Sequence, residues 1–191
     1  MSRPTVNQRL FVAAYPPRAL VETWLRALSR MPLPEHRAVS IDQVHLTLQF
    51  IGDTPAKELD AVMESVERSC AGLRQWTLTP REWIALPERG PARLVAVETD
   101  APPTLLELQR RLARRLATNV RTNPSKGFLP HLTLCRFRVP TRLNAPLPKL
   151  DTSASVPFDV SQVVLVRSVL RSEGAEHVPV HHCELGLHRE M

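Results

Sequence analysis

Aromatic residues are scarce in this chain of 191 residues, at 5% of the total, so an array of base-stacking platforms for single-stranded nucleic acid is not expected. Cysteine is also rare. Cys70, Cys135 and Cys183 are odd in number and widely spaced, and no Cys-x-x-Cys occurs. A disulfide framework or a zinc ribbon is therefore unsupported, and we expect free thiols in a reducing compartment.

Several functional segments are missing. No apolar run approaches the length of a membrane span, and residues 1–9 lack the apolar stretch of a secretory signal. We therefore expect a soluble, cytoplasmic protein. No Gly-rich Walker loop occurs, which argues against ATP use, and no Gly-x-Ser-x-Gly motif indicates a serine hydrolase. His181, His182 and His188 form a loose cluster without matching carboxylates, which predicts surface histidines rather than a metal site.

Positive charge predominates, with a formal net charge of +6 and a sequence pI of about 10.0. Such an excess favours polyanionic partners such as nucleic acid, although a basic surface without a specific partner is an equal alternative. A helix expected after Pro103 carries four arginines on one side, namely Arg110, Arg111, Arg114 and Arg115. They form either a solvated helix face or a surface that steers RNA.

Hydrophobic residues make up 43% of the chain, which is typical of a globular protein of about one domain. Alternation and turn residues predict strands at Arg9–Tyr15, Val44–Ile51, Gln75–Leu86, Arg93–Glu98 and His131–Phe137, with a closing pair at Phe158–Leu170 and His177–Leu187 around Gly174. Helical spacing predicts helices over Leu20–Met31, Leu59–Cys70 and Leu105–Leu116, the second of them opened by a turn and cap at Gly52–Pro55. The Pro-rich stretch Pro140–Pro157 is expected to be a connection.

A repeat organises these elements. RLFVAA at Arg9 is followed by a helix and then by HLTLQF at His45, while RLVAVE at Arg93 is followed by a helix and then by HLTLCR at His131. The intervals are 45 − 9 = 36 and 131 − 93 = 38 residues. A strand-helix-strand unit therefore occurs twice, which predicts one domain over residues 1–191 with two similar lobes that face each other.

The tetrapeptide His-Leu-Thr-Leu occurs in the last strand of each unit. Alternate residues of a strand share a face, so His45 projects with Thr47, and His131 projects with Thr133. The leucines between them, Leu46, Leu48, Leu132 and Leu134, are expected to point into the core. Bringing the two strands together would create a site of two imidazoles and two hydroxyls.

That set of groups suits a phosphodiester. A neutral imidazole can take a proton from water while an imidazolium protonates a leaving ribose oxygen. Threonine hydroxyls can donate hydrogen bonds to the non-bridging phosphate oxygens. A single strand histidine is more often structural, but two copies in matching units favour a catalytic pair, His45 and His131, with Thr47 and Thr133 on the phosphate. Protons and hydrogen bonds can then handle the charge, so neither a metal nor a cofactor is expected.

With these motifs the sequence resembles the two-histidine phosphoesterases (HxTx motif), specifically the RNA 2′,3′-cyclic phosphodiesterases, or RNA 2′,5′-ligase-like proteins. The resemblance covers nearly the whole chain, through the segments RLFVAAYPP, HLTLQFIGD, ARLVAVE, PHLTLCRF and SVLRSEG. It implies a bilobal α/β (α+β) fold in which two antiparallel sheets flank a central cleft with helices outside.

The resemblance also implies further site residues. Arg136 matches a phosphate-binding arginine, although strict alternation places it on the face opposite His131. Either the strand twists or ends there, or Arg136 binds from the rim. Phe11 matches an aromatic of the first strand and either contacts substrate in the cleft or packs in the core. Two positions depart from the family: Val95 stands near a common tryptophan, and His177 near a common tyrosine.

We therefore expect an RNA 2′,3′-cyclic 3′-phosphodiesterase, a phosphoric diester hydrolase that leaves 2′-phosphates and can in reverse join a 2′,5′ linkage. Family analogy makes His131 the base and His45 the acid, although the two motifs are too similar to assign the roles from sequence. The alternatives are an enzyme on another small cyclic nucleotide or a 2′,5′-oligonucleotide, and a non-catalytic RNA-binding module. The expected partners are RNA ends or cyclic nucleotides, without a membrane and without ATP, and the expected state is a monomer.

Overall fold

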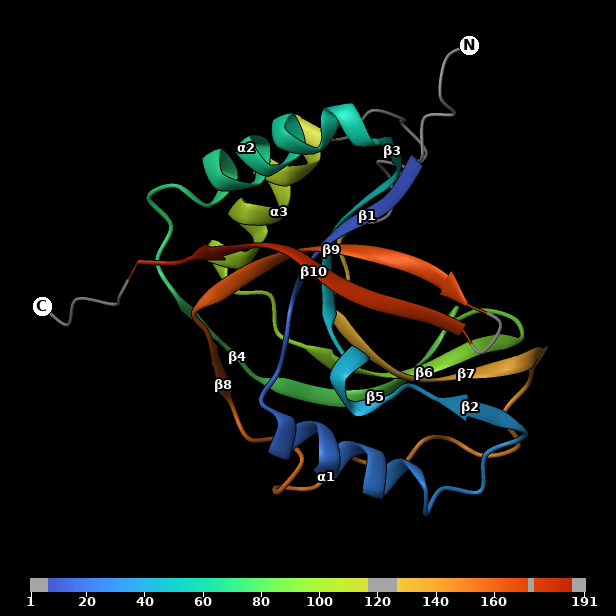
Figure 1. Ribbon diagram of the computed structural model, residues 1–191. Coiled ribbons are helices and arrows are strands. Elements are labelled where there is room, and N and C mark those ends of the chain that lie inside the picture. The colour runs from blue at the N-terminus through green and yellow to red at the C-terminus, as the bar shows by residue number, and fades with distance from the viewer. Residues whose placement is uncertain (1–6, 117–126, 172–173, 187–191) are drawn as a thin grey trace, which may run out of the picture.

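The computed structural model describes residues 7–116, 127–171 and 174–186 (Figure 1). Its strands are β1 (Asn7–Ala14), β2 (His36–Ala38), β3 (Leu46–Pro55), β4 (Trp76–Leu78), β5 (Pro80–Leu86), β6 (Ala92–Thr99), β7 (His131–Thr141), β8 (Phe158–Val160), β9 (Gln162–Arg171) and β10 (Gly174–Glu184). Its α-helices are α1 (Arg18–Leu28), α2 (Leu59–Cys70) and α3 (Pro103–Leu116). Single 3-10 turns occupy Ile41–Gln43 and Ala56–Glu58. Residues 172–173 of the expected closing turn, together with His188 and Leu187, lie outside the described residues.

Eight strands form one antiparallel sheet: seven follow the order β10-β9-β1-β3-β7-β6-β5, and the eighth, β2, pairs with β7. Strands β3 and β7 meet through a single residue pair, Leu46 and Leu132. The sheet therefore consists of two half-sheets, β10-β9-β1-β3 and β5-β6-β7-β2, which are joined only at that pair. The expected α+β class with two antiparallel lobes is confirmed, and β4 and β8 add a separate two-stranded sheet.

The two strand-helix-strand units are β1-α1-β3 and β6-α3-β7, and their helices are exchanged between the lobes. Helix α3 packs against β3, whereas α1 contacts β7. Figure 1 shows α2 and α3 together on one side of the strands and α1 on the opposite side. Each helix therefore covers the motif strand of the other unit, which ties the two half-sheets into one packed structure.

The helices bury the apolar stripes that their spacing predicts. Leu105, Leu108, Leu112 and Leu116 of α3 are all at most 4% exposed. Trp24 of α1 is fully buried, and its indole Nε1 donates a 2.8 Å hydrogen bond to the carbonyl oxygen of Ala154. This bond holds the connection between β7 and β8 against α1, because a buried indole N–H needs a partner.

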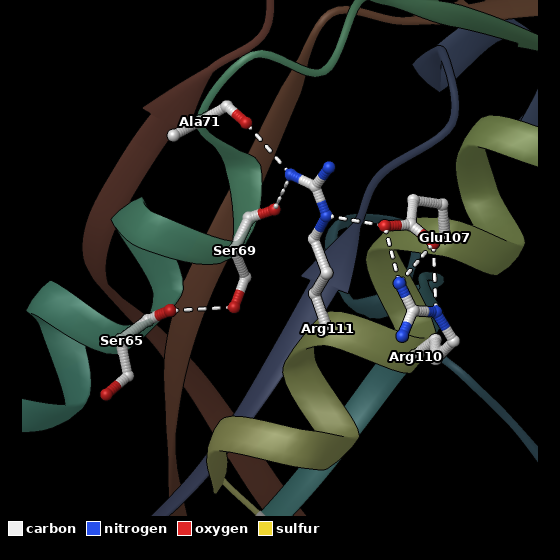
Figure 2. Close-up of polar contacts among 6 residues, drawn as sticks. All are labelled: Ser65, Ser69, Ala71, Glu107, Arg110 and Arg111. Carbon is white, nitrogen blue, oxygen red and sulfur yellow. Dashed lines mark hydrogen bonds and ion pairs between the residues drawn. The ribbon is translucent and has the colours of Figure 1, made fainter.

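Two of the four arginines on α3 serve the fold. Arg111 donates hydrogen bonds to the carbonyl oxygens of Ser69 (3.3 Å) and Ala71 (2.9 Å) and to Oε1 of Glu107 (2.7 Å), as Figure 2 shows. Arg110 pairs with the same glutamate at 2.8 Å. The carbonyls at a helix C-terminus lack partners within the helix, so Arg111 satisfies the end of α2 and docks it on α3.

The expected helix start at Gly52–Pro55 is wrong. Strand β3 continues to Pro55, which pairs with Asn7 at the beginning of β1. The Thr54 hydroxyl bonds the carbonyl oxygen of Gly52 at 3.2 Å instead of capping a helix, and α2 begins only at Leu59. The local cap signal is overridden because β1 extends to Asn7 and pairs along its whole length.

The strand expected over Phe158–Leu170 is interrupted. It divides into β8, which pairs with β4, and β9, which pairs with β1 and β10. At the break, the carbonyl oxygen of Ser161 accepts a 2.8 Å hydrogen bond from the amide of Leu185. The hairpin of β9 and β10 itself is confirmed, and it places one edge of the sheet beside the cleft described next.

Candidate active site

The junction between the half-sheets brings the two motif copies together. His45 and Thr47 flank Leu46, and His131 and Thr133 flank Leu132, the residue that pairs with Leu46. The four motif leucines are at most 2% exposed, whereas both histidines and both threonines are half-buried. The predicted alternation is therefore confirmed: the leucines enter the core, and the polar side chains face the opposite side.

The two histidines share the same local hydrogen bond. His45 Nδ1 lies 2.6 Å from the carbonyl oxygen of Gln43, and His131 Nδ1 lies 2.9 Å from that of Leu129. A carbonyl only accepts, so Nδ1 carries the hydrogen in both rings. Each neutral imidazole therefore keeps the lone pair of Nε2 free, and the ring orientation is fixed by the backbone two residues earlier.

The four motif side chains line one cleft of about 930 Å³. Its lining also includes three arginines and several rings, namely Arg9, Arg37, Arg136, Phe11, Phe50 and His177. The three arginine side chains are exposed at the rim, so the cleft presents positive charge around the two imidazoles. A phosphate between the imidazoles would therefore be attracted and also within reach of hydrogen-bond donors.

Arg136 reaches the cleft because β7 is irregular. Val95 of β6 pairs with Cys135, and Ala96 pairs with Thr133, so Leu134 is an extra residue on β7. Leu134 and Cys135 are consecutive and both fully buried, which reverses the alternation beyond them. This bulge places Arg136 on the cleft side and resolves the conflict with strict alternation.

The same bulge occurs in the first unit. Val12 of β1 pairs with Gln49, and Ala13 pairs with Thr47, so Leu48 is the extra residue on β3. Leu48 and Leu134 occupy the same place in the two motif copies. The repeat therefore extends beyond the motif to its backbone irregularity, and Phe50 of β3 takes the position that Arg136 has in β7.

A second small group of rings supports His45. The ring of Phe11 lies 4.9 Å from that of His45 and 4.9 Å from that of His177, and the His45 and His177 rings are 5.0 Å apart. Tyr15 adds a contact with His45 at 5.8 Å. Only 4% of Phe11 is exposed, so its ring forms part of the cleft wall and is also packed against its neighbours. These contacts fix the plane of the His45 ring.

Comparison with known proteins shows the family of this chain. The sequence profile of the 2′-5′ RNA ligase superfamily matches residues 16–171. The chain belongs to this superfamily. It is therefore a phosphoesterase. Two relatives named RNA 2′,3′-cyclic phosphodiesterase are each 27% identical: one from Aquifex aeolicus over 152 residues (78% of this chain and 81% of the relative), and one from Methanothermobacter thermautotrophicus over 139 residues (71% and 75%).

Solved structures share the fold of this superfamily member. A Thermus thermophilus protein matches with a TM-score of 0.79 and 24% identity, covering 93% of this chain and 97% of that one. E. coli LigT, solved with 3′-AMP, matches with a TM-score of 0.78 and 24% identity, covering 95% and 99%. In the described part of the chain, no helix has the length and apolarity needed to cross a membrane. Over the same residues, no three or more His, Cys, Asp or Glu side chains are grouped to hold a metal ion.

Burial and positive neighbours keep His45 neutral in the phosphoesterase cleft. The pKa of His45 is lowered to about 4, mainly by burial of the ring and also by the positive neighbours His177, Arg136 and His131, while the hydrogen bond to Gln43 raises it. Burial and Arg136 also lower the pKa of His177. At neutral pH the free cleft therefore holds His45 as an uncharged imidazole, which an anionic phosphate would help to protonate.

We expect the ring of His45 to titrate near pH 4 in the free protein, which NMR of the imidazole resonances would measure. Below that pH the ring gains a proton, and because catalysis needs one neutral imidazole to accept a proton, kcat/KM should fall on its acidic limb. Arg136→Gln removes a positive neighbour and should therefore raise the pKa of His45 and move this limb to higher pH. Arg114→Gln, outside the cleft lining, is the matched control. An unchanged titration in Arg136→Gln would contradict the electrostatic account.

Several cleft residues escaped sequence reasoning, among them Leu94 and Phe50 as well as the rim arginines Arg9 and Arg37. Leu94 of β6 lines the cleft and pairs with Arg136, whereas its neighbour Val95 is fully buried. Phe50 is 51% exposed, with the guanidinium carbon of Arg9 5.1 Å from its ring centroid. The sequence did contain one indication that Phe50 faces the cleft: when the two repeats are aligned, Phe50 occupies the same position as Arg136. Among the described residues of α3, no arginine lines the cleft.

Proposed function

We propose that this phosphoesterase opens RNA 2′,3′-cyclic phosphate ends to 2′-phosphates by acid–base catalysis between His45 and His131. The observation that carries the proposal is the Leu46–Leu132 junction, which brings both His-x-Thr pairs to one cleft. The names of the relatives from Aquifex aeolicus and Methanothermobacter thermautotrophicus support this substrate class.

The proposed reaction transfers two protons. One imidazole Nε2 takes a proton from water, the water oxygen bonds to phosphorus, and the bond from phosphorus to O3′ breaks. The other imidazole protonates the departing O3′, which leaves the phosphate on O2′. Family analogy gives the base role to His131 and the acid role to His45. Because the free cleft keeps His45 neutral, that assignment requires the bound phosphate to raise its pKa.

The other cleft side chains would bind the charge and the nucleoside. Thr47 and Thr133 can donate to the non-bridging oxygens, and Arg136 supplies a guanidinium at the rim. The exposed ring of Phe50 and the half-buried ring of His177 are the candidate surfaces for a base, since every base can stack on a flat side chain. Phe11 would affect the substrate indirectly, because it packs against the rings of His45 and His177.

The remaining parts of the proposal are a metal-free and ATP-free reaction, a monomer, and action in the cytoplasm. Reversal of the same step would join a cyclic phosphate to a 5′-hydroxyl in a 2′,5′ linkage, but hydrolysis should dominate in water unless the RNA ends are held together. The alternatives are another small cyclic nucleotide, a 2′,5′-oligonucleotide, and a non-catalytic RNA-binding module. The paired Nδ1 hydrogen bonds, which leave both Nε2 atoms free, favour catalysis over binding alone.

One assay tests the function directly. Purified protein is incubated with the four nucleoside 2′,3′-cyclic phosphates and with a short RNA that ends in a cyclic phosphate, and the 2′- and 3′-phosphate products are separated. Production of 2′-phosphates supports the proposal. Exclusive 3′-phosphates would overturn the regiochemistry, and binding without turnover would favour the RNA-binding alternative.

Turnover should be unchanged after exhaustive treatment with EDTA, because two imidazoles and the rim arginine supply the proton transfers and charge. The measurement is the initial rate with a mononucleotide cyclic phosphate before and after chelation, with zinc, magnesium and manganese added back separately. A loss of rate that one of these ions restores would show that a metal takes part in the reaction.

Salt should weaken the binding of long RNA more than that of a mononucleotide, because each additional phosphate contact releases counterions. The double variant Arg9→Gln/Arg37→Gln removes two charges from the cleft rim. The slope of log KM for RNA against log salt concentration should become smaller, by about one unit for each lost phosphate contact. Arg114→Gln/Arg115→Gln on α3 is the matched pair. An equal flattening in that pair would instead place the basic helix in the path of RNA.

A further inference from the structure

A second hollow of about 640 Å³ lies between the end of α2 and strand β10, and it shares no lining residue with the cleft. Its wall contains two of the three cysteines, Cys70 and Cys183, together with His181 and Glu67. These residues come from two segments far apart in the sequence. None of them has a part in the proposed reaction, so the inference below does not rest on it.

The two thiols are in direct contact. The thiol of Cys70, the last residue of α2, is hydrogen-bonded to that of Cys183 on β10. Both side chains are buried, at 5% and 6% exposed, but both border the hollow. Cys135 on β7 differs, because it is fully buried in the core and does not line the hollow. The fold therefore pairs two cysteines and isolates the third.

A carboxylate and an imidazole stand beside the pair. His181 precedes Cys183 by two residues on β10, so the two side chains share a face of the strand. His181 Nε2 lies 2.9 Å from Oε1 of Glu67, and the imidazole also hydrogen-bonds the sulfur of Cys183. The expectation of a histidine cluster without carboxylates is wrong for His181, whose partner is supplied by α2. His182 instead bonds Oε1 of Gln162 at 2.9 Å.

These contacts make the two sulfurs unequal. The hydrogen bond with Cys70 and the nearby His181 lower the pKa of Cys183, against the opposing effects of burial and of Glu67. The same thiol–thiol bond, together with burial, raises the pKa of Cys70, against a smaller effect of Arg111. Cys183 therefore has the lower pKa of the two thiols and more readily forms the thiolate, the form that reacts with oxidants.

The position of Cys70 is held from both sides. Arg111 binds the carbonyl oxygens of Ser69 and Ala71, the two neighbours of Cys70 in the chain (Figure 2). The thiol is thus presented from a fixed helix end toward β10. The two sulfurs are already neighbours, as a disulfide with an S–S bond of about 2.0 Å requires.

We propose that Cys183 and Cys70 form a hydroperoxide-oxidised dithiol, in which Cys183 reacts first and Cys70 resolves the product. The Cys183 thiolate attacks one peroxide oxygen, the O–O bond breaks, and the leaving oxygen takes a proton, which gives a sulfenic acid and, with hydrogen peroxide, water. The Cys70 sulfur then displaces the hydroxyl from Cys183, and its proton leaves with that hydroxyl as a second water. The two sulfurs lose two electrons in total, and the peroxide gains them.

The test counts free thiols in the full-length protein under denaturing conditions after exposure to dilute hydrogen peroxide. Wild type should fall from three thiols to one and return to three with dithiothreitol, and non-reducing peptide mapping should join Cys70 to Cys183. Cys135→Ser should fall from two thiols to none. Cys183→Ser should keep both of its thiols, and Cys70→Ser should stop at a sulfenic acid on Cys183, trapped by dimedone.

Retention of all three thiols in wild type would overturn the proposal, as would equal oxidation of Cys183→Ser or a crosslink that includes Cys135. His181→Phe adds a test of the imidazole: Cys183 should be alkylated by iodoacetamide at a lower pH in wild type than in this variant. An unchanged alkylation profile would remove His181 from the account. Circular dichroism of each variant before oxidation shows that a changed thiol count does not come from unfolding.

Discussion

His45→Ala and His131→Ala should each reduce kcat for a 2′,3′-cyclic nucleotide by roughly 10²–10⁴-fold, the usual contribution of one general acid or base. Each change removes an Nε2 from the cleft, and neither disturbs the leucine pair that joins the half-sheets, because the side chains lie on the opposite face. KM should change much less than kcat, since the phosphate retains its threonine and arginine donors. Steady-state kinetics of the purified variants measures both.

The double variant His45→Ala/His131→Ala should lose less than the product of the two single losses, because acid and base act in one step. His36→Ala is a matched control. Its Nδ1 bonds the carbonyl oxygen of Pro34 at 2.8 Å, the same local arrangement, but His36 does not line the cleft and its removal should leave kcat unchanged. Full activity of His45→Ala would mean that the repeat is structural.

The motif strands could be read from sequence because their pattern is local. Alternation within each His-Leu-Thr-Leu segment is fixed by the pleat of a strand, so Leu46 and Leu132 enter the core and the histidines face away from it. The repeat then predicted two equivalent units. What alternation alone could not show is that the two strands meet at the pair between their motifs, because the joining of two half-sheets depends on long-range packing.

The bulges at Leu48 and Leu134 had no such local signal. A bulge is defined by the partner strand, here Ala13 and Val12 in the first lobe and Ala96 and Val95 in the second. Strict alternation therefore placed Arg136 on the face opposite His131, although the resemblance named it as a phosphate contact, and Leu94 was not singled out. Once one bulge is known, the repeat predicts the other, which is how Phe50 becomes the counterpart of Arg136.

Contacts between distant segments were equally inaccessible. His177 reaches His45 because β9 pairs with β1 and carries β10 beside the cleft. His181 meets Glu67 because α2 packs against β10. Both histidines lie in a hairpin whose sequence gives no indication of its neighbours. The helix start at Gly52–Pro55 failed for a related reason, since pairing of β3 with β1 outweighed a local cap.

Thr47→Val and Thr133→Val should each lower kcat by roughly 10²–10³-fold, the cost of removing one preorganised donor from a charged transition state. Valine keeps the β-branched shape that suits a strand, so β3 and β7 should retain their pairing with Ala13 and Ala96. The change should lower kcat rather than raise KM, because the hydrogen bonds to the non-bridging oxygens stabilise the transition state more than they stabilise the bound diester.

The control for this prediction is Thr77→Val on β4. Its hydroxyl donates a 2.6 Å hydrogen bond to the exposed carboxylate of Asp159, neither residue lines the cleft, and its loss should leave kinetics unchanged. The two cleft threonines should also be unequal if the lobes have different tasks. In that case one of the two threonines binds the phosphate beside the general acid. The valine variant of that threonine should regain more of its kcat than the other variant when the leaving group needs no protonation, as in a p-nitrophenyl phosphodiester. Equal recovery in both variants would mean that the threonines bind the phosphate without preference for either imidazole, and no loss in either would exclude their hydroxyls from the reaction.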